Sequence, residues 1–128
     1  MIKLKHTKMI KIDLPGSKSY TNRALIITSL AKGTTKIIDP LISDDTKYMV
    51  KALKQLGIKI KTKKDQFIVT GQTFKPSKKE IYIGNSGTSA RFLTALASII
   101  PGTTIITGEN RMKKRPIKDL LDALENLG

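Results

Sequence analysis

Apolar residues fall along this chain in two recurring kinds of run, one typical of helices and one typical of strands. Residues 19–31 and 88–100 are apolar on nearly every side, which predicts two helices that are buried all round. A glycine and a short β-branched run follow each of them, "TTKII" at 34–38 and "TTIIT" at 103–107, and such runs predict strands. The alternation of the two patterns predicts a mixed α/β fold.

A second helix is predicted after each of these strands, because apolar residues return at helical spacing on one side only. The two stripes are Met49, Ala52, Leu53 and Leu56 in the first half, and Ile117, Leu120, Leu121 and Leu124 in the second. Ser43 or Asp44 can cap the first of these helices, and Pro116 suits an early position of the second. Gly57 and Gly128 are placed to end them.

The two halves form an internal repeat when Arg23 is aligned with Arg91. Each copy then runs through an arginine, an apolar helix, Gly-Thr-Thr, Ile-Ile, a polar turn and Ala-Leu-x-x-Leu-Gly. The first copy continues into two strands, "IKIKTKK" and "DQFIVTG", joined near Lys64–Asp65, whereas the second reaches Gly128 where those strands would begin. We therefore expect βαβαββ units, the second incomplete, in a longer protein; the alternative is a natural end at a helix cap.

The repeat divides the chain into three segments. Residues 1–14 are predicted to form an N-terminal strand that ends at Leu14, and residues 15–80 the first unit. The strand "IYIG" (81–84) opens the second unit, residues 81–128, which lacks its last two strands. Two similar units of this size are enough for one domain with a buried core.

The charge of the chain narrows the choice of partner. Its net charge is +14, which suits nucleic acid, an anionic membrane surface or small anionic ligands. The lysines are scattered, are not interleaved with aromatic residues and do not line one side of an apolar helix, so nucleic acid and membrane are disfavoured. No apolar run reaches the ~18 residues of a membrane span, and no secretory signal opens the chain, so we expect a cytoplasmic protein.

Several kinds of catalytic chemistry are excluded by residues that the chain lacks. Cysteine is absent, which excludes disulfides, thiolate metal sites and a cysteine nucleophile. The only histidine, His6, is expected on the surface, and no group of residues has metal-ligand spacing or forms a serine–histidine triad. The candidate chemistry therefore lies in lysines, arginines and helix starts.

The stretch "GSKSYTNR" (16–23) is the first candidate for an anion site. It lacks the Gly-x-x-x-x-Gly-Lys-Ser/Thr spacing of a P-loop. A helix that begins near Ser19 still offers free N–H groups to an anion, with Lys18 beside it and Arg23 one turn further along the same face. The alternative is an ordinary surface helix start with solvated charges.

Two further stretches repeat this chemistry. "GNSGTSAR" (84–91) occupies the matching place in the second unit, where Gly87 allows a ligand close to the backbone and Arg91 lies in the first turn. "GENRMKKRP" (108–116) follows a strand and carries dense positive charge suited to carboxylates or phosphates, although a solvated basic turn is the alternative. The matching turn of the first unit holds Asp44 and Asp45, most simply helix caps.

"LPGSKSYTNRAL", "GNSGTSARF" and "GENRMKKRPI", with "SDD" and "ALxxLG", resemble in order and spacing the N-terminal part of the EPSP synthase family, from about Ile12 to Gly128. The resemblance implies transfer of the enolpyruvyl group of phosphoenolpyruvate to the 5-hydroxyl of shikimate 3-phosphate, without metal or cofactor, in the shikimate pathway. It implies the enolpyruvyl transferase fold, an inside-out α/β barrel, with substrates between two domains of three βαβαββ units each. Residues 1–14 would then belong partly to the other domain.

The resemblance also implies roles for individual residues. For shikimate 3-phosphate these are Lys18, Ser19 and Arg23; for phosphoenolpyruvate they are Lys18, Gly87, Thr88 and Arg111. Lys18, which would reach both substrates, is the implied catalytic residue. Asp45, Asn85 and Arg91 match further polar positions near the cleft.

The same resemblance has gaps. Phe92 stands where a proline is common, which bears on phosphoenolpyruvate affinity and inhibitor response. The acid/base carboxylates of the family lie in a part that this chain lacks, so we expect it to be inactive alone, at most a weak anion binder, and part of a monomeric enzyme. A related transferase acting on a UDP-amino sugar and a basic nucleic-acid-binding domain are the alternatives.

Overall fold

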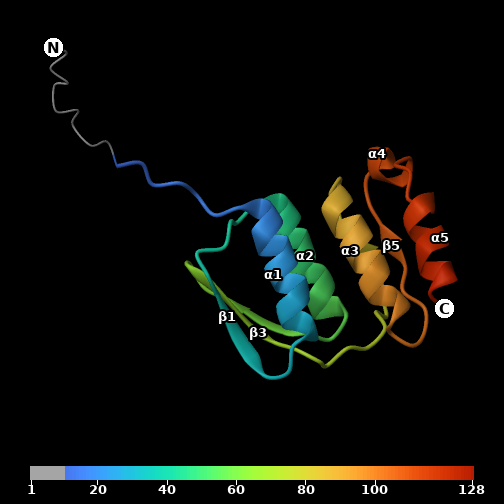
Figure 1. The fold of residues 1–128 in the computed structure, drawn as a ribbon, viewed down its shortest axis with the longest axis horizontal. Coiled ribbons are helices and arrows are strands. Elements are labelled where there is room, and N and C mark those ends of the chain that lie inside the picture. The colour runs from blue at the N-terminus through green and yellow to red at the C-terminus, as the bar shows by residue number, and fades with distance from the viewer. Residues whose placement is uncertain (1–10) are drawn as a thin grey trace, which may run out of the picture.

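The structure is a computed structural model that describes residues 11–128 (Figure 1). His6 and most of the predicted N-terminal strand lie outside the described residues. Residues 11–17 are neither helix nor strand, and Ile12 and Leu14 are 72% and 85% exposed. No described strand pairs with residues 11–14, which the resemblance assigns partly to the other domain, so the N-terminal strand ending at Leu14 stays a prediction.

The first unit forms a three-stranded antiparallel sheet covered by two helices. Its elements are α1 (Lys18–Leu30), β1 (Thr34–Ile38), α2 (Asp44–Gln55), β2 (Lys59–Thr62) and β3 (Gln66–Thr70). The strand order is β1-β3-β2, and Val69 of β3 faces Thr35 on one side and Ile60 on the other. The predicted turn between the last two strands is confirmed, since Lys63 N–H donates to the Gln66 carbonyl at 2.9 Å.

The second unit is less complete. Its elements are β4 (Ile81–Tyr82), α3 (Gly87–Ser98), β5 (Ile106–Thr107), α4 (Asn110–Lys113) and α5 (Lys118–Asn126). β4 and β5 pair in parallel, so the strand predicted over 103–107 is confirmed only at its last two residues. The short helix α4 was not predicted. Figure 1 shows α1, α2 and the three-stranded sheet on one side of the molecule and α3, α4, α5 and β5 on the other.

The core is built from one face of α1, α2 and α3 together with inward-facing residues of the strands. Its most buried large side chains are Leu25, Met49, Leu53, Leu56, Val69, Ile81, Ile83 and Leu93. The stripe predicted on α2 is thus confirmed, but α1 and α3 are not buried all round: Tyr20, Ile27 and Ile99 are 77%, 65% and 65% exposed. The other elements pack against only one side of these helices, and the opposite side stays in solvent. α5 carries no fully buried residue, so its stripe is only half-covered.

Serine side chains begin the helices of the core. Ser43 caps α2 and forms a capping box with Thr46, so Asp44 and Asp45 lie in the first turn and the expectation that either caps the helix is wrong. Pro116 precedes α5 rather than starting it, because the helix begins after Ile117. The predicted glycine stops are confirmed at both helix ends by positive φ angles. Within residues 11–128, none of the helices is both long and apolar enough to cross a membrane.

Candidate functional site

A polar cavity of about 400 Å³ lies where the two units meet. It is bounded by the start of α1, the first turn of α2, the start of α3 and the segment after α4. The lining residues are Lys18, Asp45, Asn85, Gly87, Thr88, Arg91 and Arg115. Six of the seven are residues singled out from the sequence, so the fold brings predicted site residues of both repeat copies to one place.

Lys18 and Asp45 form an ion pair on one wall of this cavity. The Lys18 Nζ lies 2.9 Å from Asp45 Oδ2, and the two side chains are 47% and 27% exposed. Burial of the Asp45 carboxyl acts to raise its pKa, but the nearby Ser86 hydroxyl, the Lys18 ammonium and Arg115 together hold that pKa below its ordinary value of 3.8. Asp45 is therefore a carboxylate at neutral pH that positions the Lys18 ammonium beside the cavity.

The start of α3 forms the opposite wall. Ser86 caps the helix: its Oγ accepts from Ser89 N–H at 3.3 Å and donates to Ser89 Oγ at 2.8 Å. Gly87 and Thr88 occupy the first turn, where backbone N–H groups have no carbonyl of their own helix to bind. Asn85 Oδ1 is buried with no hydrogen-bond partner among residues 11–128. This wall can accept an anion and still has an unused acceptor for a ligand hydroxyl.

Two arginines meet at Gly87. A Cβ at this position would lie 2.5 Å from Arg115 Nη1 and 3.5 Å from Arg91 Nη1, so the missing side chain lets the Arg115 guanidinium cross the helix start. Arg91 donates to the Gly87 carbonyl at 3.3 Å and to the Pro116 carbonyl at 3.2 Å. Arg91 thus links the first turn of α3 to the segment that carries Arg115.

Other predicted site residues lie outside this cavity. Ser19 and Arg23 are exposed on α1, and Arg111 is exposed on α4. Arg115, which the sequence reasoning named only as part of a basic cluster, lines the cavity in place of Arg111. α4 ends at Lys113 and Met112 is buried, and the segment that follows brings Arg115 to the start of α3.

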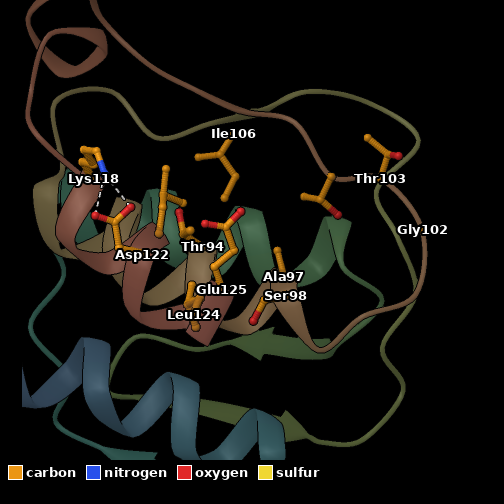
Figure 2. A pocket seen from close by; sticks show the side chains of 12 residues that line it. Thr94, Ala97, Ser98, Gly102, Thr103, Ile106, Lys118, Asp122, Leu124 and Glu125 are labelled. Carbon is orange, nitrogen blue, oxygen red and sulfur yellow. Dashed lines mark hydrogen bonds and ion pairs between the residues drawn. The ribbon is translucent and has the colours of Figure 1, made fainter. Parts of the chain in front are cut away.

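A larger cavity is a groove of about 830 Å³ between α3, α5 and the segment before β5 (Figure 2). Leu121, Leu124 and Ala97 contribute apolar surface to it, and an ion pair of 2.6 Å joins Lys118 to Asp122 along α5. None of the predicted site residues lines this groove. The groove marks the face of α5 that no described element covers. Nowhere do the described residues contain a group of three or more potential metal ligands.

Comparison with known proteins identifies the family of this chain. The family model described as EPSP synthase (3-phosphoshikimate 1-carboxyvinyltransferase) matches residues 7–128. The 3-phosphoshikimate 1-carboxyvinyltransferase of Rhizobium leguminosarum bv. trifolii is 47% identical over 116 residues, which cover 89% of this chain and 28% of that protein. The protein of the same name from Nitrosomonas eutropha is 47% identical over 121 residues, covering 92% of this chain and 28% of its own length.

The structural comparison gives the same family. The EPSP synthase of Acinetobacter baumannii matches with a TM-score of 0.85 and 28% identity over 91% of this chain and 27% of that one. The chain thus spans a little over a quarter of the length of these relatives, and the predicted α/β fold of the enolpyruvyl transferases is confirmed. On the family match and the structural likeness together, this chain belongs to the EPSP synthase family.

Proposed function

We propose that this chain forms one side of an active site that transfers the enolpyruvyl group of phosphoenolpyruvate to the 5-hydroxyl of shikimate 3-phosphate, with release of phosphate. Family membership supports the reaction class. One observation carries the proposal to the residue level: Lys18 of the first unit and the Gly87–Thr88 turn of the second unit line the same cavity. An anion held there would contact both units at once.

The proposed roles follow from the charges and their places. Lys18, held by Asp45, stabilises negative charge on both substrates as the enolpyruvyl group moves. Ser19 and Arg23, one helical turn apart on α1, bind the shikimate 3-phosphate side. The roles on the phosphoenolpyruvate side go to Gly87 and Thr88 through their N–H groups, to Arg111 as first expected and to Arg115, which lies against Gly87.

We also propose what residues 1–128 cannot do alone. Proton transfer at the reacting carbon and the 5-hydroxyl needs acid/base groups, and Asp45 is already engaged by Lys18. We therefore propose that residues 1–128 alone bind these anions weakly and do not turn them over. The complete enzyme would act as a cytoplasmic monomer without a metal or organic cofactor.

The test is a chimera in which the aligned residues of this chain replace the matching 116-residue segment of the Rhizobium leguminosarum relative. We expect phosphate release that requires both substrates, and a loss of about a hundredfold or more with Lys18→Met. Lys64→Met, which removes an exposed lysine in the turn before β3, is the matched control. A soluble, folded chimera that releases no phosphate contradicts the proposal, and turnover by the 128-residue chain alone contradicts its inactivity.

A second variant separates the two substrates. Arg23→Ala in the chimera should raise the dissociation constant for shikimate 3-phosphate at least tenfold, because a charge-assisted contact to its anionic groups is lost. Lys32→Ala, two residues beyond the last residue of the same helix, should leave that constant unchanged. An Arg23→Ala chimera that binds shikimate 3-phosphate like the unsubstituted chimera removes Arg23 from the site.

A basic nucleic-acid-binding module makes a different prediction. It should bind unrelated DNA and RNA sequences, with an affinity that falls log-linearly with salt. We expect no useful affinity of the 128-residue chain for either nucleic acid at physiological salt. Binding that survives this salt concentration would favour the nucleic-acid function instead.

A further inference from the structure

Arg23 has an unusual environment for an arginine that is proposed to bind an anion. Its side chain is exposed, and among residues 11–128 no carboxylate lies within ion-pair distance of it. Its Cζ atom lies 6.0 Å from the centroid of the Phe92 ring. Among residues 11–128, this guanidinium thus has an aromatic face on another helix beside it rather than a carboxylate.

Phe92 is well placed to hold a neighbouring side chain. It lies on α3, is half-buried and packs against the hydrophobic core, so its ring is fixed by the protein interior. α1 and α3 are in contact, and Arg91, the preceding residue on α3, lines the polar cavity. α3 therefore lines the cavity with Arg91 and contacts Arg23 of α1 with the next residue, Phe92.

A ring and a carboxylate restrain an arginine in different ways. A carboxylate occupies the N–H donors and neutralises the charge, whereas a cation–π contact uses the face of the guanidinium and leaves those donors free. A long side chain that is already restrained loses less conformational entropy when it binds a ligand. A ring at this distance can therefore pre-order Arg23 while leaving it able to bind an anion.

We propose that Phe92 is a positioning residue that holds the Arg23 guanidinium ready for the anionic substrate bound at the start of α1. The inference rests on the proposed function, in which that substrate is shikimate 3-phosphate. Phe92 does not touch the substrate, and it acts on the affinity for this substrate through Arg23. It thereby makes the second unit contribute to a subsite formed by the first.

The test compares Phe92→Leu and Phe92→Tyr in the chimera. Removing the ring should raise KM for shikimate 3-phosphate about two- to fivefold, the size of an exposed cation–π contact, while KM for phosphoenolpyruvate and kcat change less. Phe92→Tyr keeps the ring and should restore the lower KM. Phe74→Leu makes the same change at another half-buried phenylalanine on this core and should leave both KM values unchanged.

The outcomes separate this inference from the proposed function. If the chimera is active and Phe92→Leu leaves KM for shikimate 3-phosphate unchanged, the role of Phe92 is overturned. The role is also overturned if Phe92→Leu changes this KM by the same factor whether or not Arg23 is replaced by alanine. An inactive unsubstituted chimera contradicts the proposed function instead. In that case a double-mutant cycle of Arg23→Met and Phe92→Leu, measured by urea unfolding of the 128-residue chain, decides whether Phe92 holds Arg23. Coupling between the two changes in unfolding free energy supports the contact, and additive changes overturn it.

Discussion

Leu56 and Leu127 occupy the same place in the two copies of the Ala-Leu-x-x-Leu-Gly motif, yet their surroundings are opposite. Leu56 is fully buried after α2, whereas Leu127 is 84% exposed after α5. The first unit covers α2 with the β2–β3 hairpin, while the described residues contain no such hairpin over α5. The apolar pattern thus fixes which face of a helix is hydrophobic, but a covering element decides whether that face is buried.

The candidate site lies away from the face of α5 that stays exposed. It lies at the N-terminal ends of α1, α2 and α3, and the core residues Leu25, Met49 and Leu93 lie on these same three helices. The uncovered groove lies between α3, α5 and the segment before β5, away from the N-terminal end of α3 (Figure 2). The comparison therefore predicts that stability and site geometry depend on the first unit and α3, and only weakly on α5.

The largest expected effect is on the core. Leu56→Ala removes a fully buried side chain next to the hairpin and should lower the free energy of unfolding by about 2–5 kcal/mol, measured by urea denaturation. Leu127→Ala makes the same change at the matching exposed position and should cost less than about 0.5 kcal/mol. Equal losses at the two positions would show that α5 is covered as well as α2.

A smaller effect is expected at the start of α2. Ser43→Ala removes the Oγ that accepts from Thr46 N–H and should cost about 1 kcal/mol of unfolding free energy. Ser43→Gly is the matched control and should cost only a few tenths of a kcal/mol, because glycine is tolerated at this position. A loss for Ser43→Ala within error of zero would mean that tertiary packing alone holds this helix.

The smallest effect depends on pH. Because the folded protein holds the pKa of Asp45 below 3.8, the ionised carboxylate adds stability above that pH, and the gain is lost as pH falls through the lower folded value. Asp45→Asn should therefore cost at most about 1 kcal/mol at neutral pH, and the difference from the unsubstituted chain should vanish in acid.

Urea unfolding from pH 7 down to pH 3 measures this difference. Asp44→Asn, a more exposed carboxylate in the same helical turn, controls for charge removal near the helix start. A stability difference between Asp45→Asn and the unsubstituted chain that grows toward acid would contradict the assigned ion pair with Lys18. It would mean that the folded protein raises the pKa of Asp45 instead of lowering it.

Much of this architecture could be predicted from the sequence because local signals and tertiary packing agree there. The stripe on α2, the turn before Gln66 and the glycine ends follow from periodicity and backbone conformation. The full burial of α1 and α3 was mispredicted, because a run that is apolar on all sides does not show how many of its faces will have neighbours.

Part of the candidate site could likewise be predicted from the sequence, and part could not. The helix starts at Lys18 and Gly87 could be placed from sequence, since glycines and hydroxyl residues precede apolar runs at matching repeat positions. The choice between Arg111 and Arg115 could not be made, because it depends on where the short helix α4 ends and on the approach of its following segment to Gly87. That approach is a long-range contact without a local sequence signal.

The central claim is that the starts of α1 and α3, from two different units, form a single anion site. Its most direct test is an NMR titration of the ¹⁵N-labelled 128-residue chain with phosphoenolpyruvate. We expect the amide signals of Lys18, Gly87 and Thr88 to shift with one common dissociation constant, and Lys18→Met to weaken the response at Gly87 as well. Shifts confined to one unit, or a response at Gly87 that is indifferent to Lys18→Met, would contradict a shared site.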